Sequence, residues 1–402
     1  MKKSLIRHII AFVAVLITMF VAIILVYCIP NSIISNNVEQ SLKILDGLGQ
    51  NSKYTGSHYD YSTDTTMVYT MLKGNGNPIY EAMYNLNYAR YWHGYSVFLR
   101  PLFMVFDVGE VWFIISCIFF ILLTTAILLL WKKLNIGVAV VFFVSILCFY
   151  VSTISTSLQY SGVFNITLIF VICIIVLKDK ASFDTISLTF MIVGMVTNFI
   201  DFLTVPLITL GIPLIIYILL CDKNEKTSFL KILKIVVILS LVWLLGYSLT
   251  WVAKWCLGTL FTGDNVFKLA LQGITERGGV ESGVNVLDRL RAIYANLATL
   301  FKNKIVFIGV GFASILLIVF AFVFRVAKTK WKSIGIFLVI GAMPYIWYFV
   351  LSNHSFVHNW FTYRTQFITL FSGLYILMSI VDWDKCRAWL KKLKKSQEKI
   401  ND

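Results

Sequence analysis

Long, uninterrupted apolar runs recur along the chain and dominate its pattern. Most hold roughly 18–22 residues, enough for an α-helix to cross a hydrocarbon core of about 30 Å. The runs are continuously apolar rather than alternating, so they do not predict a β-barrel. Ten spans are expected, at residues 9–29, 111–131, 136–153, 163–178, 183–200, 203–221, 232–255, 305–325, 333–351 and 366–382. The predicted fold class is an all-α polytopic membrane protein, with residues 1–402 as a single membrane domain.

Two places in this pattern admit a second interpretation. The first run follows the basic start "MKKSLIRH", as the apolar part of a secretory signal would. A signal has an apolar region of only about 7–15 residues, and no small-residue cleavage site follows this run, so an uncleaved span is expected. The segments 183–200 and 203–221 are separated by "NFIDFLTVP" with almost no loop, so a re-entrant hairpin is the alternative to two full spans.

Composition and charge agree with a membrane location. The chain is 58% hydrophobic and 14% charged, whereas a soluble globular chain is nearer a quarter charged. The net charge of +15 is concentrated in alternate loops such as "WKKLN" and "FRVAKTKWK". This positive-inside pattern places both termini in the cytoplasm and argues against nucleic-acid binding, which needs a basic groove. The basic tail, 383–402, is expected to lie on the inner leaflet against membrane lipids.

Two predicted external segments are long. The first, residues 30–110, contains "TDTTMVYTML", which predicts a short helix capped by Ser62 or Thr63. The stretch 79–100 that follows is amphipathic enough to lie along the membrane surface. The second, residues 256–304, ends in "VLDRLRAIYANLATLFKN", a predicted interfacial helix. No Walker loop, GxSxG or GxGxxG motif occurs in a suitable context, so soluble-nucleotide chemistry is not expected.

The stretch "YARYWHGYSVFLRPL" places cationic groups in an oily region. Arg90, His93 and Arg100 are spaced to lie along one helical face, although Pro101 disfavours helix at the residue before it. Arginine clamps phosphate through two parallel hydrogen bonds, and His93 is suited to share a proton with the same phosphate. The alternative is that these side chains only snorkel to the headgroup level.

Two carboxylates are candidates for catalysis. Asp64 stands at the start of the predicted short helix, where it either caps the helix or takes a proton from an acceptor hydroxyl as general base. Asp201 lies between two apolar spans with no basic neighbour in sequence, which indicates a functional residue rather than a turn aspartate. Its partner would come from another segment, with Arg90, Arg100 and Arg364 as candidates.

The last external loop, "NHSFVHNWFTYRTQ", concentrates further candidates for substrate binding, namely His354, His358, Tyr363 and Arg364. Arg364 is expected to be a second anion anchor. The aromatic side chains either stack on a sugar or belong to the interfacial belt. The two histidines are four residues apart, a spacing suited to a metal, but no acidic third ligand stands nearby, so no metal site is predicted. The seven cysteines form no CxxC pair and indicate neither a zinc site nor a disulfide framework.

These segments resemble the membrane glycosyltransferases of the GT-C superfamily, which use lipid-phosphate sugar donors. The matching residues are "YSTDTT" in the first external loop, "RYWHGYSVFLRPLF" leading into the second span, "NFIDFLTVPLITLGIP" and "HNWFTYR". Many members carry adjacent acidic residues in the first loop, whereas Asp64 is flanked by threonines. Asp60 would supply the second carboxylate, and which of the two is the base stays open.

The resemblance implies a mechanism and partners. A polyprenyl-phosphate-linked sugar would enter from the bilayer, and Arg90, Arg100 or Arg364 would hold its phosphate. Asp64 would deprotonate a hydroxyl of a cell-envelope glycan, lipid or protein in a single inverting displacement. Asp201 would orient the acceptor or help bind an optional divalent cation; no cofactor is certain. The reaction would occur outside the cytoplasmic membrane of a bacterium.

Two other functions are consistent with the same residues. A transporter or flippase of lipid-linked sugars needs the arginines but no base. A membrane acyltransferase of surface polysaccharide needs a histidine base near an acyl donor reached from inside, which the external position predicted for His93, His354 and His358 disfavours.

Overall fold

The structure is a computed structural model that describes residues 2–49, 53–54, 57–58, 60–72, 76–84, 88–221, 227–279, 283–302, 304–326 and 331–401. Six helical segments are long and apolar enough to cross a membrane. They are α1 (Lys2–Tyr27), α6 (Val108–Lys133), α9 (Leu158–Leu177), α10 (Phe183–Ile200), α12 (Phe229–Thr262) and the consecutive pair α16 (Trp331–Gly341) and α17 (Met343–Val350). The chain is therefore compatible with a multi-pass membrane protein.

Shorter apolar helices and surface helices complete the described fold. The shorter apolar helices are α7 (Ile136–Leu147), α11 (Ile208–Cys221), α15 (Lys304–Val323) and α20 (Phe367–Ser379). The remaining elements are α2 (Asn31–Leu48), β1 (Lys53–Tyr54), β2 (Ser57–His58), α3 (Tyr61–Tyr69), α4 (Pro78–Tyr84), α5 (Ser96–Phe103), α8 (Val151–Ser155), α13 (Val266–Gly278), α14 (Val286–Lys302), α18 (Ser352–Val357), α19 (Asn359–Thr362), the 3-10 helix η1 (Tyr363–Gln366) and α21 (Trp383–Asn401).

The prediction of an all-helical fold is confirmed apart from the two-residue strands β1 and β2, but the count of about ten spans is not. Every predicted span contains a helix, yet several are shorter than predicted. The segment predicted at 203–221 becomes helical only at Ile208, because Asp201 ends α10 and a turn follows. The segment predicted at 136–153 ends as a helix at Leu147. In the second case the helix ends among apolar residues, where Tyr150 takes a left-handed backbone conformation with a φ of 55°.

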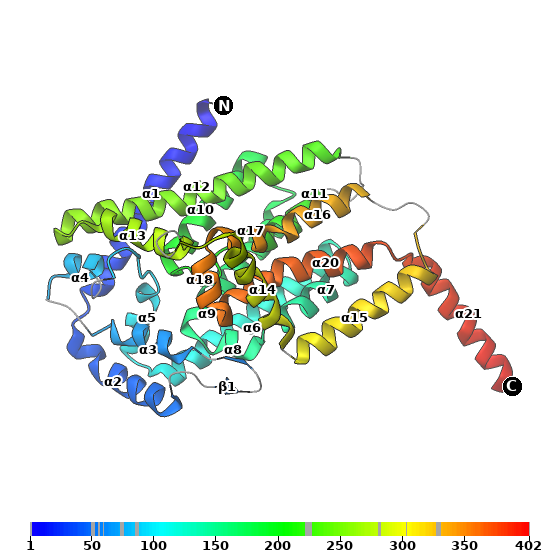
Figure 1. Cartoon of the computed structure of the whole chain (residues 1–402), viewed down its shortest axis with the longest axis horizontal. Coiled ribbons are helices and arrows are strands. Elements are labelled where there is room, and N and C mark those ends of the chain that lie inside the picture. The colour runs from blue at the N-terminus through cyan, green and yellow to red at the C-terminus, as the bar shows by residue number, and fades with distance from the viewer. Residues whose placement is uncertain are drawn as a thin grey trace.

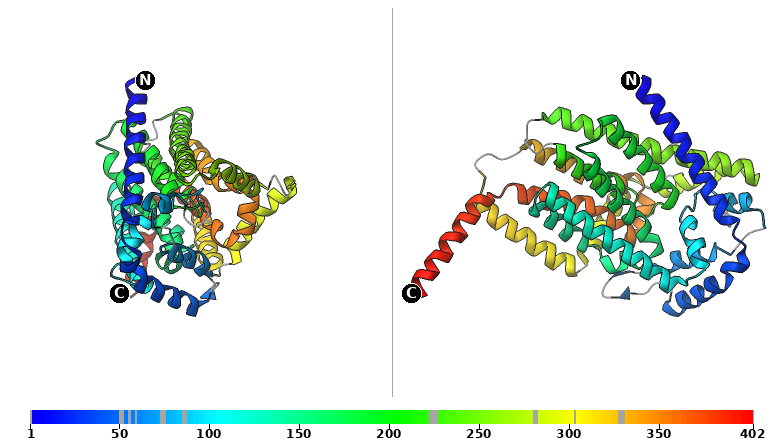
Figure 2. Two further views of the ribbon diagram at one scale, coloured as in Figure 1. Left: turned by 90° about the vertical axis from the view of Figure 1, so that its left-hand side faces the viewer. Right: turned by 180° about the vertical axis from the view of Figure 1, so that it is seen from behind.

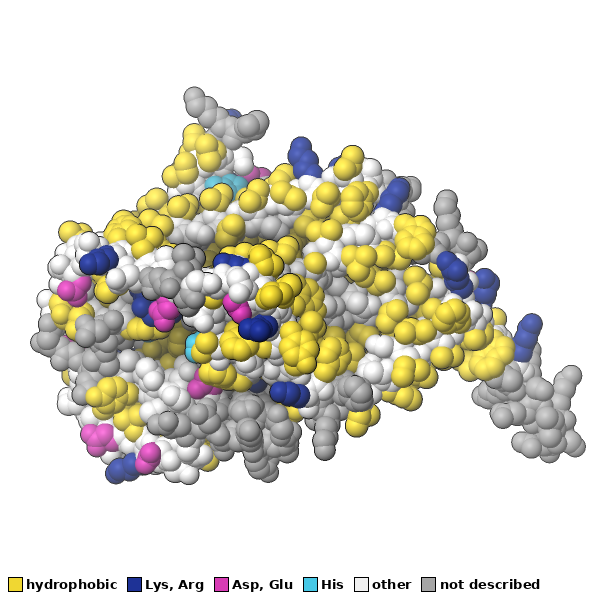
Figure 3. All heavy atoms as spheres, viewed as in Figure 1, with side chains coloured by type: hydrophobic (Ala, Val, Ile, Leu, Met, Phe, Trp, Pro, Cys, Tyr) yellow, Lys and Arg dark blue, Asp and Glu magenta, His cyan; other side chains and the backbone are white. Residues whose placement is uncertain are grey.

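Most of the long apolar helices lie side by side along the long axis of the molecule, and α1 crosses them at a steep angle (Figures 1 and 2). The helices α2–α5, α13 and α18 gather toward the left-hand side of Figure 1, and we call this part the loop end. On the face drawn in Figure 3, the far right carries Lys and Arg side chains without Asp or Glu, whereas the loop end mixes both signs. We call the right-hand part the basic end.

Glycines bring the backbones of α10 and α12 into direct contact. A Cβ at Gly194 would stand 2.2 Å from the carbonyl oxygen of Trp243, and one at Gly246 would stand 2.2 Å from that of Met191. Small residues at helix crossings let membrane helices approach closely and pack by van der Waals contact. This crossing fixes the end of α10, and with it Asp201, against α12.

The first external segment differs from its prediction in two ways. The short helix exists as α3, but its N-cap is Asp60, whose carboxylate accepts from the Thr63 amide, and neither Ser62 nor Thr63 is the cap. The stretch 79–100 is not one helix, because α4 ends at Tyr84 and α5 begins at Ser96. Arg90 and His93 therefore lie outside any helix, and the prediction that they share a helical face with Arg100 is wrong. Helix α5 continues through Arg100 although Pro101 follows it.

The second external segment follows its prediction more closely. The predicted interfacial helix is α14, which covers Val286–Lys302. The tail is helical as α21.

Candidate functional site

Hydrogen bonds between distant segments hold the loop end together. The Gly94 amide donates to the Phe199 carbonyl oxygen at 2.7 Å, which ties the 88–95 stretch to the end of α10. Gln159 Nε2 contacts Thr204 Oγ1 at 3.5 Å, and this links the start of α9 to the turn after α10. Four segments that the sequence singled out therefore meet here: the start of α3, the 88–95 stretch, the turn after Asp201 and the loop around residues 354–364.

Asp64 is buried and its oxygens face the start of α9. They accept from the backbone amides of Leu158 at 3.0 Å and Gln159 at 3.1 Å, and from the Ser157 hydroxyl at 3.3 Å. Burial raises the pKa of Asp64 to about 7, and these hydrogen bonds oppose that shift. A carboxylate at a helix N-terminus satisfies amides that otherwise lack partners. Asp64 thus caps α9, a helix 93 residues away in sequence, rather than its own helix.

Asp60 lies beside the last external loop. Its Oδ2 accepts from the Thr63 hydroxyl at 2.8 Å and contacts Trp360 Nε1 at 3.4 Å. Asp60 is buried, with 6% of its surface exposed. This contact brings the first and last external segments together, as the sequence hypothesis of a shared site requires.

Asp201 is buried, and its hydrogen-bond donors belong to the turn that follows it, at Leu203 and Thr204. Both of its oxygens accept from the Thr204 amide, at 3.2 and 3.0 Å. Burial raises the pKa of Asp201 to about 7. Within the described chain it forms no ion pair with Arg90, Arg100 or Arg364, the partners considered from the sequence. A buried carboxylate with a pKa near neutrality is suited to accept a proton.

Arg364 has the most unusual surroundings of the predicted cations. Its exposure is 0%, and Nη1 donates to the Trp360 carbonyl oxygen at 3.0 Å. Nε and Nη2 are buried without a hydrogen-bond partner in the described part of the chain. The guanidinium carbon lies 4.2 Å from the centroid of the Tyr160 ring and 4.9 Å from that of Tyr363. A buried guanidinium without a carboxylate partner is costly, so this geometry indicates a place for an anion.

The Tyr363 side chain is buried against Arg364, and its ring also packs on Phe149, with centroids 5.8 Å apart. Among the described residues, Tyr160 Oη beside Arg364 is also buried without a partner, as are Gln159 Oε1 at the start of α9 and His358 Nδ1 six residues before Arg364. Buried unsatisfied polar atoms are few in native structures. Their concentration around the start of α9 and η1 supports a ligand-binding interpretation of this region.

Two of the predicted histidines are held as neutral rings. Nδ1 of His93 is 3.1 Å from the Tyr95 hydroxyl and Nε2 is 3.1 Å from the Tyr88 carbonyl oxygen. Burial lowers the pKa of His93 to about 3. His354 donates from Nε2 to the Leu203 carbonyl oxygen at 2.9 Å, and burial lowers its pKa to about 3 as well. Both rings position backbone segments, and neither carries a positive charge near neutral pH.

The rings of His354 and His358 pack at a tilt of 56°, with centroids 4.9 Å apart. No group of three or more His, Cys, Asp or Glu side chains among the described residues is arranged to hold a metal ion. Asp201, the residue expected to help bind an optional divalent cation, likewise belongs to no such group among the described residues.

Arg100 does not face a ligand site. Its guanidinium donates to the carbonyl oxygens of Val26 at 2.9 Å, Ile29 at 2.6 Å and Met71, and to Asn31 Oδ1 at 3.1 Å. These acceptors belong to the end of α1, the start of α2 and the turn after α3. Arg100 joins these elements, so we leave it out of the proposed phosphate-binding residues.

Lys254 is a buried cation that the sequence did not single out. It lies inside α12 with 0% exposure and donates to the Met83 carbonyl oxygen at 2.8 Å. The Ala82 carbonyl oxygen lies 3.4 Å away. The last carbonyls of a helix attract cations, so Lys254 fixes α4 to α12. A lysine within an apolar run is a sequence signal that would have found it.

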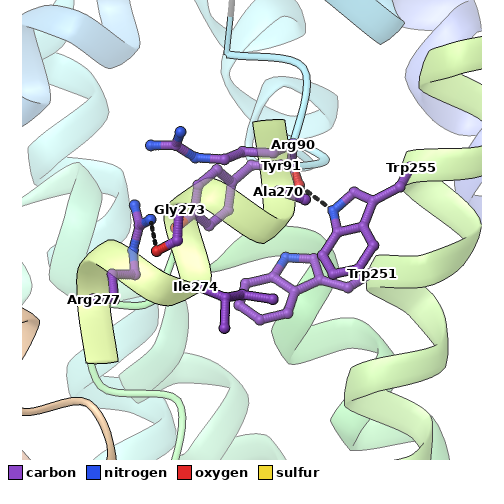
Figure 4. A pocket seen from close by; sticks show the side chains of 8 residues that line it. All are labelled: Arg90, Tyr91, Trp251, Trp255, Ala270, Gly273, Ile274 and Arg277. Atoms are coloured by element: carbon purple, nitrogen blue, oxygen red, sulfur yellow. Dashed lines mark hydrogen bonds between the residues drawn. The ribbon is translucent and has the colours of Figure 1, made fainter. Parts of the chain in front are cut away.

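Arg90 lies in a second cationic place that the sequence identified only in part. A shallow, open pocket is lined by Arg90, Tyr91, Trp251, Trp255, Ala270, Gly273, Ile274 and Arg277. Arg277 of α13 was missed because its sequence context, "ITERGG", predicts a solvated turn. In Figure 4 both guanidinium groups lie toward one side and both indoles toward the other, with the Tyr91 ring nearer the guanidinium groups. Burial raises the pKa of Tyr91 to about 12, and Arg277, Arg90 and Asp201 also act on it, so this pocket and Asp201 are neighbours.

No protein-family model matches the chain, no curated protein is similar to it in sequence, and no solved structure matches its fold. The resemblance to the GT-C superfamily consequently stays a prediction from the residues quoted above.

Proposed function

We propose that this chain is a membrane glycosyltransferase that moves a sugar from a polyprenyl-phosphate donor to a cell-envelope acceptor. The observation that carries the proposal is the buried Arg364 guanidinium, which has two donor atoms without a partner among the described residues and lies at the same end of the molecule as the buried Asp60, Asp64 and Asp201. Phosphate satisfies a guanidinium through paired, charge-assisted hydrogen bonds. The aromatic rings of Tyr160 and Tyr363 cover the cation and keep water from it.

The proposed reaction is a single inverting displacement. An acceptor hydroxyl oxygen attacks the anomeric carbon, and the bond from that carbon to the phosphate oxygen breaks with its electron pair. Arg364 stabilises the phosphate as charge develops on it. The hydroxyl proton passes to a carboxylate. We assign this role to Asp201 rather than Asp64, because the oxygens of Asp64 accept from the amides that begin α9, a distant helix, whereas those of Asp201 accept from the turn that directly follows it.

The proposed setting is a bacterial cytoplasmic membrane with the loop end outside. On the face drawn in Figure 3, Lys and Arg side chains are in excess at the basic end, and this excess supports a cytoplasmic position for that end. A lipid-linked donor would then reach the loop end from the bilayer, where soluble nucleotide sugars are not available.

The proposal is tested with the full-length chain in nanodiscs that contain a radiolabelled polyprenyl-phosphate sugar. Arg364→Ala should reduce release of polyprenyl phosphate at least 100-fold, about 2.7 kcal/mol of transition-state stabilisation. Arg364→Lys should restore only part of it, because lysine lacks the planar fork. The matched control is Arg291→Ala, since Arg291 is exposed on α14 and pairs with Asp288. Full turnover by Arg364→Ala would refute the proposed role.

A transporter or flippase of lipid-linked sugars is the second candidate. It would bind the lipid phosphate at Arg364 in the same way, but it would need no base. Asp201→Asn distinguishes the two functions. A transferase should lose turnover with donor binding intact, whereas a transporter should still move the lipid. A histidine-based acyltransferase is less well supported, because hydrogen bonds occupy both ring nitrogens of His93.

A further inference from the structure

The pocket between α12, α13 and the 88–95 stretch brings two cations together. A Cβ built on Gly273 would stand 2.7 Å from Nη1 of Arg277 and 3.5 Å from Nη1 of Arg90. The two terminal nitrogens are therefore at most about 6 Å apart, close enough for like charges to repel appreciably at the effective dielectric constants of protein surfaces. Glycine is what leaves the space between them open, since any larger residue at position 273 would enter it.

Neither arginine is neutralised by a carboxylate. Within the described residues no ion pair involves Arg90 or Arg277. Glu276 acts on Arg90 electrostatically without forming such a pair. Nη1 of Arg277 donates to the Gly273 carbonyl oxygen at 2.8 Å, and Arg90 is hydrogen-bonded to the Tyr88 side chain, whereas Nε of both arginines is buried without a partner in the described part of the chain. Two adjacent guanidinium groups with unused donors are the arrangement that binds a phosphate group.

The other side of the pocket is aromatic. Trp251 and Trp255 stack with ring centroids 6.0 Å apart, and the Trp251 ring meets that of Tyr91 edge-on at 5.9 Å. Trp255 Nε1 donates to the Arg90 carbonyl oxygen at 3.1 Å, while Trp251 Nε1 is buried without a partner. An apolar wall with a few unused polar groups is typical of a small-molecule site.

From this pairing we infer that the pocket is a binding site for a sugar phosphate, with the phosphate between Arg90 and Arg277 and the sugar ring against the indoles of Trp251 and Trp255 (Figure 4). The site is separate from Arg364, which contacts Trp360, Tyr160 and Tyr363 instead. The inference goes beyond the proposed transfer reaction and does not depend on it. Such a ligand is either the headgroup of a lipid carrier or a soluble phosphorylated sugar.

The test measures binding to the full-length chain in nanodiscs of zwitterionic lipid, with glucose 1-phosphate, inorganic phosphate and glucose as probes. Glucose 1-phosphate should bind most tightly, because only it engages both sides of the pocket. Arg277→Ala should weaken its binding at least tenfold. Gly273→Leu should do the same while every charge is kept, because the new side chain fills the space between the arginines. Thermal melting shows whether each variant is folded.

Two controls separate this site from others. Arg291→Ala should bind all three probes unchanged, and Arg277→Ala should weaken glucose 1-phosphate binding to the same extent in an Arg364→Ala background, where the proposed donor site is removed. A second arm uses nanodiscs with polyprenyl phosphate and counts the retained lipid by native mass spectrometry. Loss of retained lipid in Arg277→Ala identifies the ligand as a lipid headgroup, and retention together with loss of glucose 1-phosphate binding identifies a soluble ligand. Two results would overturn the inference. One is unchanged binding of glucose 1-phosphate and inorganic phosphate by folded Arg277→Ala and Gly273→Leu. The other is that the unmodified chain binds neither of these probes.

Discussion

Asp201 and Arg364 show how burial changes the chemistry of a single side chain. Each is excluded from solvent, and neither forms an ion pair within the described residues. Burial penalises the charged form of a carboxyl group, which is why the pKa of Asp201 rises to about 7. Arginine stays charged under the same conditions. One group can therefore exchange a proton near neutral pH, while the other offers a permanent charge to an anion.

At the residue scale, the pH dependence of transfer follows from Asp201. A base must be unprotonated to accept a proton, so kcat/KM should be constant above about pH 7 and fall about tenfold per pH unit below it. Asp201→Asn should lower the plateau at least 100-fold and remove this acidic limb. The measurement is a profile from pH 5 to 9 of polyprenyl-phosphate release. An acidic limb that persists in Asp201→Asn would assign the proton transfer to another group.

At the element scale, buried ionisable side chains join helices that are distant in sequence. Lys254 connects α12 to the end of α4, and Asp64 connects α3 to the start of α9. In each case the charged side chain satisfies backbone groups that a helix terminus leaves without partners. The sequence shows a charge in an apolar or mixed-polarity setting, but not whether a ligand or a distant helix end will neutralise it.

The stability of the loop end should depend on Arg100 for this reason. Arg100→Met keeps the volume but leaves the carbonyl oxygens of Val26, Ile29 and Met71 without this donor. Each buried acceptor that loses its partner costs about 1–3 kcal/mol, so the free energy of unfolding should fall by about 3–5 kcal/mol. Thermal unfolding in detergent measures the loss, with Arg291→Met as control. An unchanged melting temperature together with weaker donor binding would return Arg100 to the phosphate-binding residues.

At the scale of the whole molecule, the alternation of helices sets which residues share an end. The segments after α10, around α13 and between α17 and α20 all emerge at the loop end, while the basic residues of Figure 3 mark the opposite end. If an odd number of membrane crossings separated two of these segments, they would lie on opposite faces of the membrane. The candidate site thus depends on the helical hairpins as well as on the individual side chains.

The proposed orientation can be measured by cysteine labelling in a cysteine-free background. Glu39→Cys at the loop end should react with a membrane-impermeant maleimide added to intact cells, and Lys234→Cys near the start of α12 should react only after permeabilisation. Both positions are exposed. Position 64 is unsuitable as a probe because its side chain is buried. Labelling of residue 39 only from the inside would exclude a reaction at the outer surface.

The sequence by itself determined the helical class, the apolar helices and most of their boundaries. A long apolar run directly predicts a helix that is excluded from water, and helix caps depend on residues close in sequence. It also selected the residues Asp64, Asp201, Arg90 and Arg364. It did not determine their roles. Groups tens to hundreds of residues away decide whether Arg100 meets a phosphate or three carbonyl groups. They also decide whether Arg277 lies in solvent or beside Arg90. Only the tertiary structure decides this, because the free energy of a buried charge is set by the partners that surround it in space.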